Sequence, residues 1–285
     1  MIRFSHTLFA LPFALLAAVM AWSANARSQP PVPFRWQELA GILVCMVGAR
    51  SAAMAFNRLA DRRLDAMNPR TCGRHLATGA LSAGSVVLFT VIASLVFVAG
   101  TLLFLPRNPL PLCASLPVLA FLFGYSFSKR FTALSHWWLG TALALAPIAA
   151  WVALRPEFAW APLVLGSAVV LWVAGFDVIY ACQDVGFDMA MRLHSVPARL
   201  GVPGALRVAA ACHLGMVLLL LVLPLVYPAF GWIYWIGAAS IAALLIYEHW
   251  LVRPDDLTRV NRAFFHVNAV VSTGLFVVGC VDLLL

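Results

Sequence analysis

Residues 81–105 read LSAGSVVLFTVIASLVFVAGTLLFL, and none of these 25 side chains carries a charge. About 20 apolar residues in a helix are enough to span the hydrocarbon core of a bilayer. The run stops at a cluster of helix-breaking residues, Pro106, Pro109 and Pro111. The stretch therefore predicts a transmembrane helix that ends just before this cluster.

Similar apolar runs recur along the whole chain, which has 285 residues, 63% of them hydrophobic. Only 11% of the residues are charged, against about 25% in soluble domains. The runs cover residues 8–22, 37–56, 81–105, 112–127, 134–154, 162–180, 204–227, 231–251 and the last segment, from 263 to the C-terminus. We therefore expect an all-α polytopic membrane protein with nine transmembrane helices, forming a single domain over residues 1–285.

The basic residues predict how these helices are oriented. Alternating the nine helices places 14 of the 19 Arg and Lys on the side of the N-terminus and 4 on the other, with Arg50 inside a helix. Cytoplasmic loops carry the excess of positive charge. The N-terminus is then cytoplasmic, in a cell inner (plasma) membrane. The net charge of +8 does not by itself indicate nucleic acid, because in a membrane protein the distribution of Arg and Lys matters more than their sum. We expect contact with membrane lipids and no nucleic-acid partner.

The N-terminus permits two readings. Arg3, the apolar run and the sequence Ala24-Asn25-Ala26 resemble a secretory signal with its cleavage site. The alternative is a retained first helix. We favour the helix, because no soluble segment follows that a signal would export.

The densest charge in the chain follows the second apolar run, where residues 57–71 read NRLADRRLDAMNPRT. Asn57, Asp61 and Asp65 are spaced four residues apart. On one continuous helix, at about 100° per residue, they drift by only about 80°, so all three can face one cavity.

A second acidic segment, Asp177–Asp188, follows the sixth apolar run. Asp177, Asp184 and Asp188 fall within about 40° of one another on the same helical geometry. Both segments lie at predicted cytoplasmic helix ends. We therefore expect them to face each other at one membrane surface.

The residue types in these segments suit a diphosphate held through magnesium. Carboxylates stacked on one helix face repel unless a cation lies among them, and Mg²⁺ binds through a few carboxylates plus substrate phosphates. The interleaved arginines suit a polyanion; they are Arg58, Arg62, Arg63, Arg70 and Arg74. The pattern predicts a cytoplasmic-face diphosphate site whose apolar substrate comes from the bilayer.

Two other readings stay open. A single juxtamembrane run of alternating Arg and Asp is commonly a solvated, ion-paired helix end that attracts anionic lipid. A transporter or lipid-binding protein could use the acids for cation coupling, but its sites usually lie at broken helices near the bilayer midplane. The acids here lie at predicted helix ends, which favours an enzyme, and magnesium-dependent release of diphosphate discriminates the two classes.

Three motifs give the chain a resemblance to the UbiA superfamily of intramembrane aromatic prenyltransferases, and it covers nearly all of the sequence. The matching residues are Asn57, Asp61 and Asp65; Asp177, Tyr180, Ala181, Asp184 and Asp188; and Tyr125, Lys129, Arg130 and Thr132. The resemblance implies helices around a central cavity, a magnesium cofactor, and transfer of a polyprenyl chain from polyprenyl diphosphate to an aromatic hydroxy acid.

The resemblance also implies roles for single residues. The magnesium ligands would be Asn57, Asp61, Asp65, Asp184 and Asp188. Arg62 and Lys129 would donate to the leaving diphosphate, and Tyr125 and Tyr180 would shelter the allylic cation. Asp177 or another carboxylate would take the ring proton, and Arg130 would bind the carboxylate of the acceptor.

Two positions depart from the pattern of the 4-hydroxybenzoate enzymes, where we expect Pro and Gln and find Ser126 and His136. Several segments look closer to a sister branch that prenylates a dihydroxynaphthoate in menaquinone synthesis. They are His6–Phe13, Asn57–Thr71, Tyr180–Asp184, Leu193–Arg199 and Phe264–Asn268. A 4-hydroxybenzoate-type acceptor of quinone biosynthesis is our first expectation, and 1,4-dihydroxy-6-naphthoate is the alternative.

Overall fold

The computed structural model describes residues 7–260 and 263–285, and within these ranges the chain is helical, with one isolated β-bridge between Arg253 and Asp256. The long helices are α1 (Thr7–Ala26), α2 (Trp36–Ala60), α4 (Ala83–Thr101), α5 (Leu110–Ser128), α6 (Ser135–Leu154), α7 (Trp160–Ala181), α9 (Val196–Val226), α10 (Trp232–Leu251) and α12 (Asn268–Leu284). Five short elements are η2 (Leu102–Phe104), α3 (Arg62–Met67), η3 (Cys182–Asp184), α8 (Val185–Ala190) and η4 (Ala263–Val267). The all-α fold is confirmed.

Eight helical segments of the described chain are long and apolar enough to cross a membrane. The long helix that does not meet this criterion is α10, whose last turns carry Glu248 and His249. The count is therefore close to the nine expected. Arg3 and His6 lie outside the described residues, as does Arg262, one of the 14 basic residues counted on the side of the N-terminus.

The helices group into two compact units. The first unit contains Phe34–Ser128, and the second contains the described residues of Ser5–Pro33 and Lys129–Leu285. The single domain expected over the whole chain stays a prediction.

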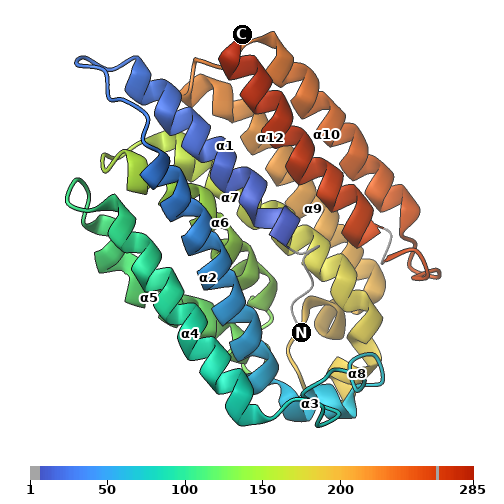
Figure 1. The fold of residues 1–285 in the computed structure, drawn as a ribbon. Coiled ribbons are helices and arrows are strands. Elements are labelled where there is room, and N and C mark those ends of the chain that lie inside the picture. Colours follow the sequence, from blue (N-terminus) through green and yellow to red (C-terminus); the bar gives the residue numbers. More distant parts are fainter. Residues whose placement is uncertain (1–6, 261–262) are drawn as a thin grey trace. The chain divides into compact units, whose positions relative to one another are not determined.

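In the first unit, α2 packs against both α4 and α5 (Figure 1). The α2–α4 approach is close because Gly48 has no side chain: a Cβ there would lie 2.7 Å from the backbone nitrogen of Phe97. Small residues allow such close backbone contact between membrane helices. Ala52, Phe97 and Leu119 fill the core that results.

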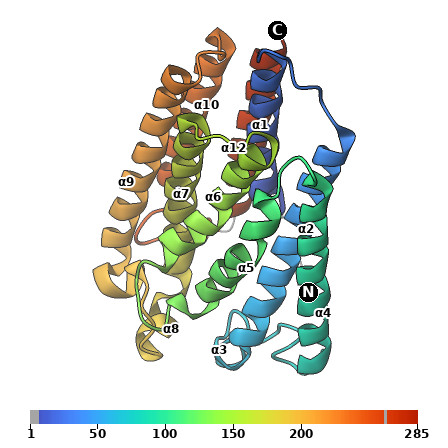
Figure 2. The same ribbon diagram turned by 90° about the vertical axis from the view of Figure 1, so that its left-hand side faces the viewer.

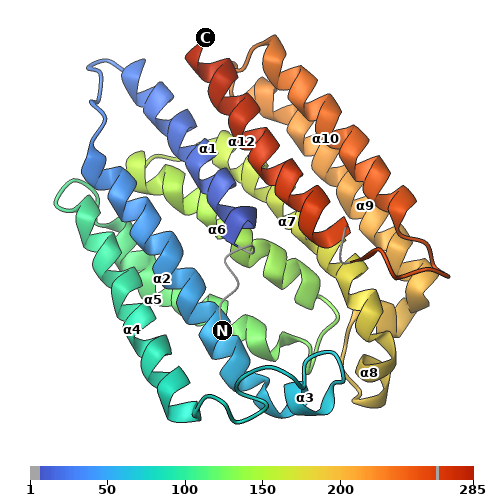
Figure 3. The ribbon, with the colours of Figure 1, turned by 45° about the vertical axis from the view of Figure 1, so that its right-hand side comes forward.

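In the second unit, α7 is the central helix and packs against α6 and α9 (Figure 2). Trp172 of α7 is fully buried and contacts the rings of Phe9, Phe13 and Phe176. Helix α12 lies between α1 and α10 (Figure 3). Because α1 supplies buried side chains such as Phe13 and Leu16 to this core, the helix reading of the N-terminal run is the one that fits the packing.

Helix α9 begins earlier than the sequence suggested. The apolar run of residues 204–227 predicted a helix start near Gly204, but α9 starts at Val196 and bends at Gly201, where φ is 68°. The side chain of Ser195 accepts a hydrogen bond from the backbone nitrogen of Ala198 and caps the helix. A serine cap followed by Pro197 is a helix-start signal, so the earlier start was readable in the sequence.

A chain of buried hydrogen bonds ties three helices of the second unit together. The indole nitrogen of Trp172 donates to Asn268 Oδ1 at 2.8 Å, and Asn268 Nδ2 donates to Glu248 Oε1 at 3.1 Å. All three side chains are fully buried. The amide of Asn268 is thus the link between α7, α10 and α12.

We expect Asn268→Leu to lower the stability of the protein by about 1–3 kcal/mol, because it keeps the volume but leaves two buried polar groups without this partner. Thermal unfolding in detergent measures the change. The matched control is Ser240→Ala, since Ser240 is exposed and bonds only within its own helix. Equal stability of Asn268→Leu and wild type would show that the amide contributes nothing.

Candidate active site

The first acidic segment does not form one continuous helix. Helix α2 ends at Ala60, and Asp61 has φ −96° and ψ 7° at its junction with α3. The prediction of an uninterrupted helix is therefore wrong at this residue. The backbone bonds Asp61 N–H to Asn57 O (2.9 Å) and Asp65 N–H to Asp61 O (2.8 Å) still continue through the junction.

This continuity brings the first two motif residues together. Asn57 Nδ2 donates to Asp61 Oδ2 at 3.0 Å and to Ser126 Oγ at 3.4 Å. Because Asn57 Nδ2 makes both contacts, Asn57 Oδ1 is the side-chain atom that can bind a ligand. Ser126, which stands where we expected proline, is a neighbour of the motif that the sequence reasoning missed.

Asp65 is held by arginines. Its Oδ1 lies 2.5 Å from Arg74 Nη1 and its Oδ2 lies 3.9 Å from Arg58 Nη1, and the residue is 7% exposed. The hydroxyl of Thr71 also donates to the backbone oxygen of Asp65 at 3.1 Å. The ion pairing of the alternative reading is therefore present at this residue, but the carboxylate is buried and not solvated.

The second acidic segment is also broken. Helix α7 carries Asp177 and Tyr180 and ends at Ala181, a 3₁₀ turn follows, and Asp188 lies in α8. A 3₁₀ turn advances about 120° per residue instead of 100°. The prediction that the three carboxylates fall within about 40° on one continuous helix is therefore wrong. Asp184, the last residue of the turn, and Asp188 in α8 are nevertheless both buried.

Asp188 has the least satisfied carboxylate of the segment. It is 2% exposed, and its Oδ2 has no hydrogen-bond partner among the described residues. A buried oxygen without a partner loses its hydration without compensation. Such an atom is suited to a cation.

No three His, Cys, Asp or Glu side chains in residues 7–260 and 263–285 form a group that could hold a metal ion by themselves. Magnesium does not require such a group, because it keeps several waters and commonly binds one or two carboxylates plus phosphate oxygens. Hard oxygen donors such as those of Asn57, Asp61 and Asp188 therefore fit Mg²⁺.

Asp177 is bound by a histidine. His136 Nδ1 lies 2.7 Å from Asp177 Oδ2, and His136 Nε2 accepts from the backbone nitrogen of Val196 at 3.3 Å. His136 is fully buried at the first turn of α6. The sequence had singled out this residue only as a departure from a family pattern.

Among the remaining predicted residues, Lys129 is bonded through its backbone to the loop after α8. The backbone nitrogen of His194 donates to the backbone oxygen of Lys129 at 2.7 Å, which fixes the loop after α8 against the start of the Lys129–Arg130 segment. Arg62 and Arg130 are exposed, and Tyr125 and Tyr180 are half-buried.

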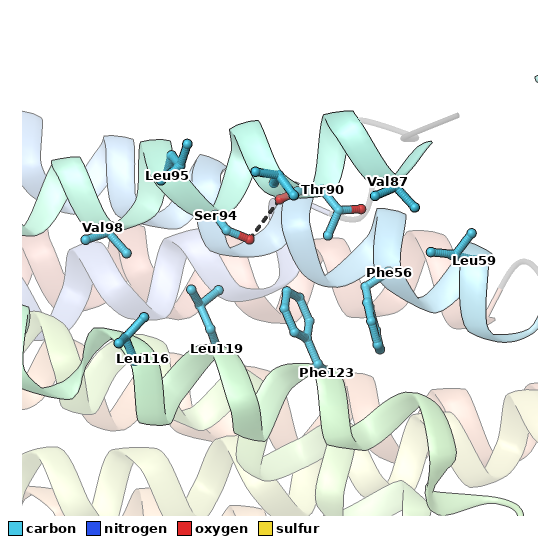
Figure 4. Close-up of a pocket in the computed structure, with 11 residues that line it drawn as sticks. Phe56, Leu59, Val87, Thr90, Ser94, Leu95, Val98, Leu116, Leu119 and Phe123 are labelled. Carbon is cyan, nitrogen blue, oxygen red and sulfur yellow. Dashed lines mark hydrogen bonds between the residues drawn. The ribbon is translucent and has the colours of Figure 1, made fainter. Parts of the chain in front are cut away.

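An apolar pocket of about 370 Å³ lies between α2, α4 and α5 of the first unit (Figure 4). Phe56 and Phe123 stack beside it with their ring centroids 4.4 Å apart. Its two hydroxyls, of Thr90 and Ser94, donate to carbonyls of their own helix. The pocket offers no polar group to a diphosphate or a carboxylate, so the acidic segments are the candidate site.

Comparison with known proteins places the chain in a family. A model of the UbiA prenyltransferase family matches residues 10–270. The chain belongs to this family. The resemblance inferred from the three motifs is thus confirmed, and the chain is an integral membrane prenyltransferase.

Relatives and solved structures agree with the assignment. The 4-hydroxybenzoate octaprenyltransferases of Nitrosomonas eutropha and Saccharophagus degradans are 32% and 31% identical to this chain, over 79% and 85% of it and 78% and 80% of their own lengths. The apo structure of a UbiA homolog from Aeropyrum pernix K1 is 31% identical, covers all of both chains and has a TM-score of 0.86. A UbiA homolog from Archaeoglobus fulgidus, bound to DMAPP and Mg²⁺, shares the fold at 16% identity, 99% coverage of both chains and a TM-score of 0.70.

Proposed function

We propose that this enzyme transfers a polyprenyl chain from polyprenyl diphosphate to 4-hydroxybenzoate in quinone biosynthesis. The relatives at 31–32% identity are 4-hydroxybenzoate octaprenyltransferases. The observation that carries the site assignment is the buried, unpartnered carboxylate oxygen of Asp188, which needs a cation. The active site lies on the cytoplasmic side of the inner membrane, in agreement with the excess of basic residues in those loops.

The two acidic segments are the magnesium ligands in this proposal. They supply oxygen donors from Asn57, Asp61, Asp65, Asp184 and Asp188, and an A. fulgidus homolog of the same fold binds DMAPP with Mg²⁺. Bound magnesium neutralises the charge that builds on the diphosphate as the allylic C–O bond breaks. Arg62 and Lys129 donate to the same oxygens.

In the reaction, the allylic C–O bond breaks and its electron pair leaves with the diphosphate. The faces of Tyr125 and Tyr180 stabilise the carbocation through cation–π attraction. Arg130 binds the carboxylate of the acceptor. The ring carbon beside the hydroxyl forms the new C–C bond, and its proton passes to Asp177 and then to solvent.

The acceptor 1,4-dihydroxy-6-naphthoate is the second candidate, because both departures from the 4-hydroxybenzoate pattern contact site residues. Ser126 Oγ lies 3.4 Å from Asn57 Nδ2, and His136 Nδ1 lies 2.7 Å from Asp177 Oδ2. The same step of C–C bond formation applies to either ring.

We expect membranes containing this chain to prenylate radiolabelled 4-hydroxybenzoate when polyprenyl diphosphate and magnesium are present. 1,4-Dihydroxy-6-naphthoate is assayed beside it, with EDTA and Asp61→Ala as controls that abolish transfer. Product from the naphthoate alone reassigns the acceptor. If neither ring is prenylated and Asp61→Ala behaves as wild type, the enzymatic reading of the acidic segments is wrong for these acceptors, and the transport or lipid-binding reading replaces it.

A further inference from the structure

His136 of α6 connects its own helix to α7, through Asp177, and to the start of α9. Its ring contacts the carboxylate of Asp177 on α7 and the backbone N–H of Val196 at the start of α9. The side chain is 0% exposed, whereas that of Asp177 is 16% exposed. The histidine is therefore the buried partner and the carboxylate reaches a more open space.

The two contacts define which ring nitrogen carries the proton. A backbone N–H can only donate, so His136 Nε2 must be the acceptor of the bond from Val196 and cannot itself hold a proton. The proton of the neutral ring then lies on Nδ1 and is donated to Asp177 Oδ2. The start of a helix leaves N–H groups without partners inside the helix, and here one of them fixes the tautomer of His136.

We propose that His136 is a positioning residue for Asp177. It holds Oδ2, so that Oδ1, which makes no hydrogen bond to any described residue, is the atom aimed at the acceptor ring. This inference rests on the proposed function, in which Oδ1 takes the proton from the ring carbon that has formed the C–C bond. The arrangement reverses that of a serine protease, where a carboxylate orients an imidazole.

A carboxylate that rotates away from the ring carbon loses much of its value as a base, because displacements of about 1 Å cost up to about 100-fold in rate. The substrates themselves do not contact His136 in this proposal. Its loss should therefore lower kcat and leave KM nearly unchanged.

The test compares His136→Asn with His136→Leu, two side chains of the same shape. Asparagine retains an N–H donor near the position of Nδ1, and leucine retains none. We expect His136→Leu to lower kcat about 30-fold, with KM for both substrates within about twofold of the wild-type values. The kcat of His136→Asn should remain within about threefold of the wild-type value. Ser135→Ala is the matched control, because Ser135 is buried beside it and its hydroxyl has no partner.

The Asp177→Asn background separates positioning from packing. If His136 acts through Asp177, the kcat values of His136→Leu and His136→Asn differ by less than about twofold when both also carry Asp177→Asn. The proposal is overturned if His136→Leu and His136→Asn lose kcat equally. It is also overturned if their difference in kcat is as large with Asp177→Asn as without it.

A readout that does not depend on activity distinguishes this proposal from the proposed function. NMR of ¹⁵N-histidine-labelled protein in detergent should show the ring of His136 neutral and protonated at Nδ1. The His136 signal is assigned by its disappearance in His136→Asn, and it should shift in Asp177→Asn. A ring protonated at Nε2 overturns the positioning role. If the ring is protonated at Nδ1 but the protein transfers no prenyl group, the proposed reaction is overturned, whereas the contact of His136 with Asp177 is retained.

Discussion

Asp188→Asn should reduce kcat for prenyl transfer by about a thousandfold and leave the protein at least as stable in detergent as wild type. The side chain is 2% exposed and one of its oxygens has no partner among the described residues. Removing a group that stabilises charge at a reaction centre typically costs 10²–10³-fold or more. Removing an uncompensated buried charge costs no folding energy, so activity and stability move in opposite directions.

Steady-state kinetics and thermal unfolding of the same preparations measure the two effects. Asp256→Asn is the control, since Asp256 lies in the exposed loop between α10 and η4 and bonds with Thr258. The Thr258 hydroxyl and amide are the main causes that lower the pKa of the Asp256 carboxyl. A large loss of stability in Asp188→Asn would mean that the carboxylate supports the fold, and its assignment as a metal ligand would fail.

The membrane helices could be predicted from the sequence because a bilayer imposes one simple condition. Any helix that crosses it needs about 20 consecutive apolar residues, and runs such as 81–105 satisfy this without reference to tertiary contacts. The early start of α9 was also present in the sequence, as a serine cap at Ser195 and the following Pro197. The polar residues around this cap, Arg192, His194 and Arg199, hide it, because an apolar run begins only after them.

The breaks in the acidic segments were not predictable in the same way. No Gly or Pro lies within residues 57–67, and the 3₁₀ turn at Cys182–Asp184 contains neither. Helical spacing therefore suggested continuous faces. Neighbours at i and i+4 stay together up to such a break, as Asn57 and Asp61 show by remaining in contact.

The pairing of His136 with Asp177 joins residues that are 41 positions apart. Periodicity describes only neighbours on one helix, so no spacing argument could connect them. The available signal was that His136 replaces an expected glutamine in the family motif. Such a departure indicates that position 136 differs from the family pattern, but it does not identify Asp177 as the partner of His136.

Asp65 should respond to substitution differently from Asp188, because its charge is paired. We expect Asp65→Asn to lower kcat about 100-fold and also to lower the free energy of unfolding by about 1–3 kcal/mol. The side chain is 10% exposed and that of Arg74 is 31% exposed. This partial exposure puts the effect below the 3–5 kcal/mol seen when one partner of a fully buried pair is removed.

The double variant Asp65→Asn with Arg74→Gln separates the two roles of the carboxylate. Replacing both partners removes the unpaired guanidinium, so stability should recover most of the loss measured in Asp65→Asn, whereas transfer should stay low because the metal ligand is still absent. Kinetics and unfolding in detergent of the three variants test this. If activity recovers together with stability, Asp65 serves only to anchor the loop through Arg74, and the magnesium ligands of the first segment reduce to Asn57 and Asp61.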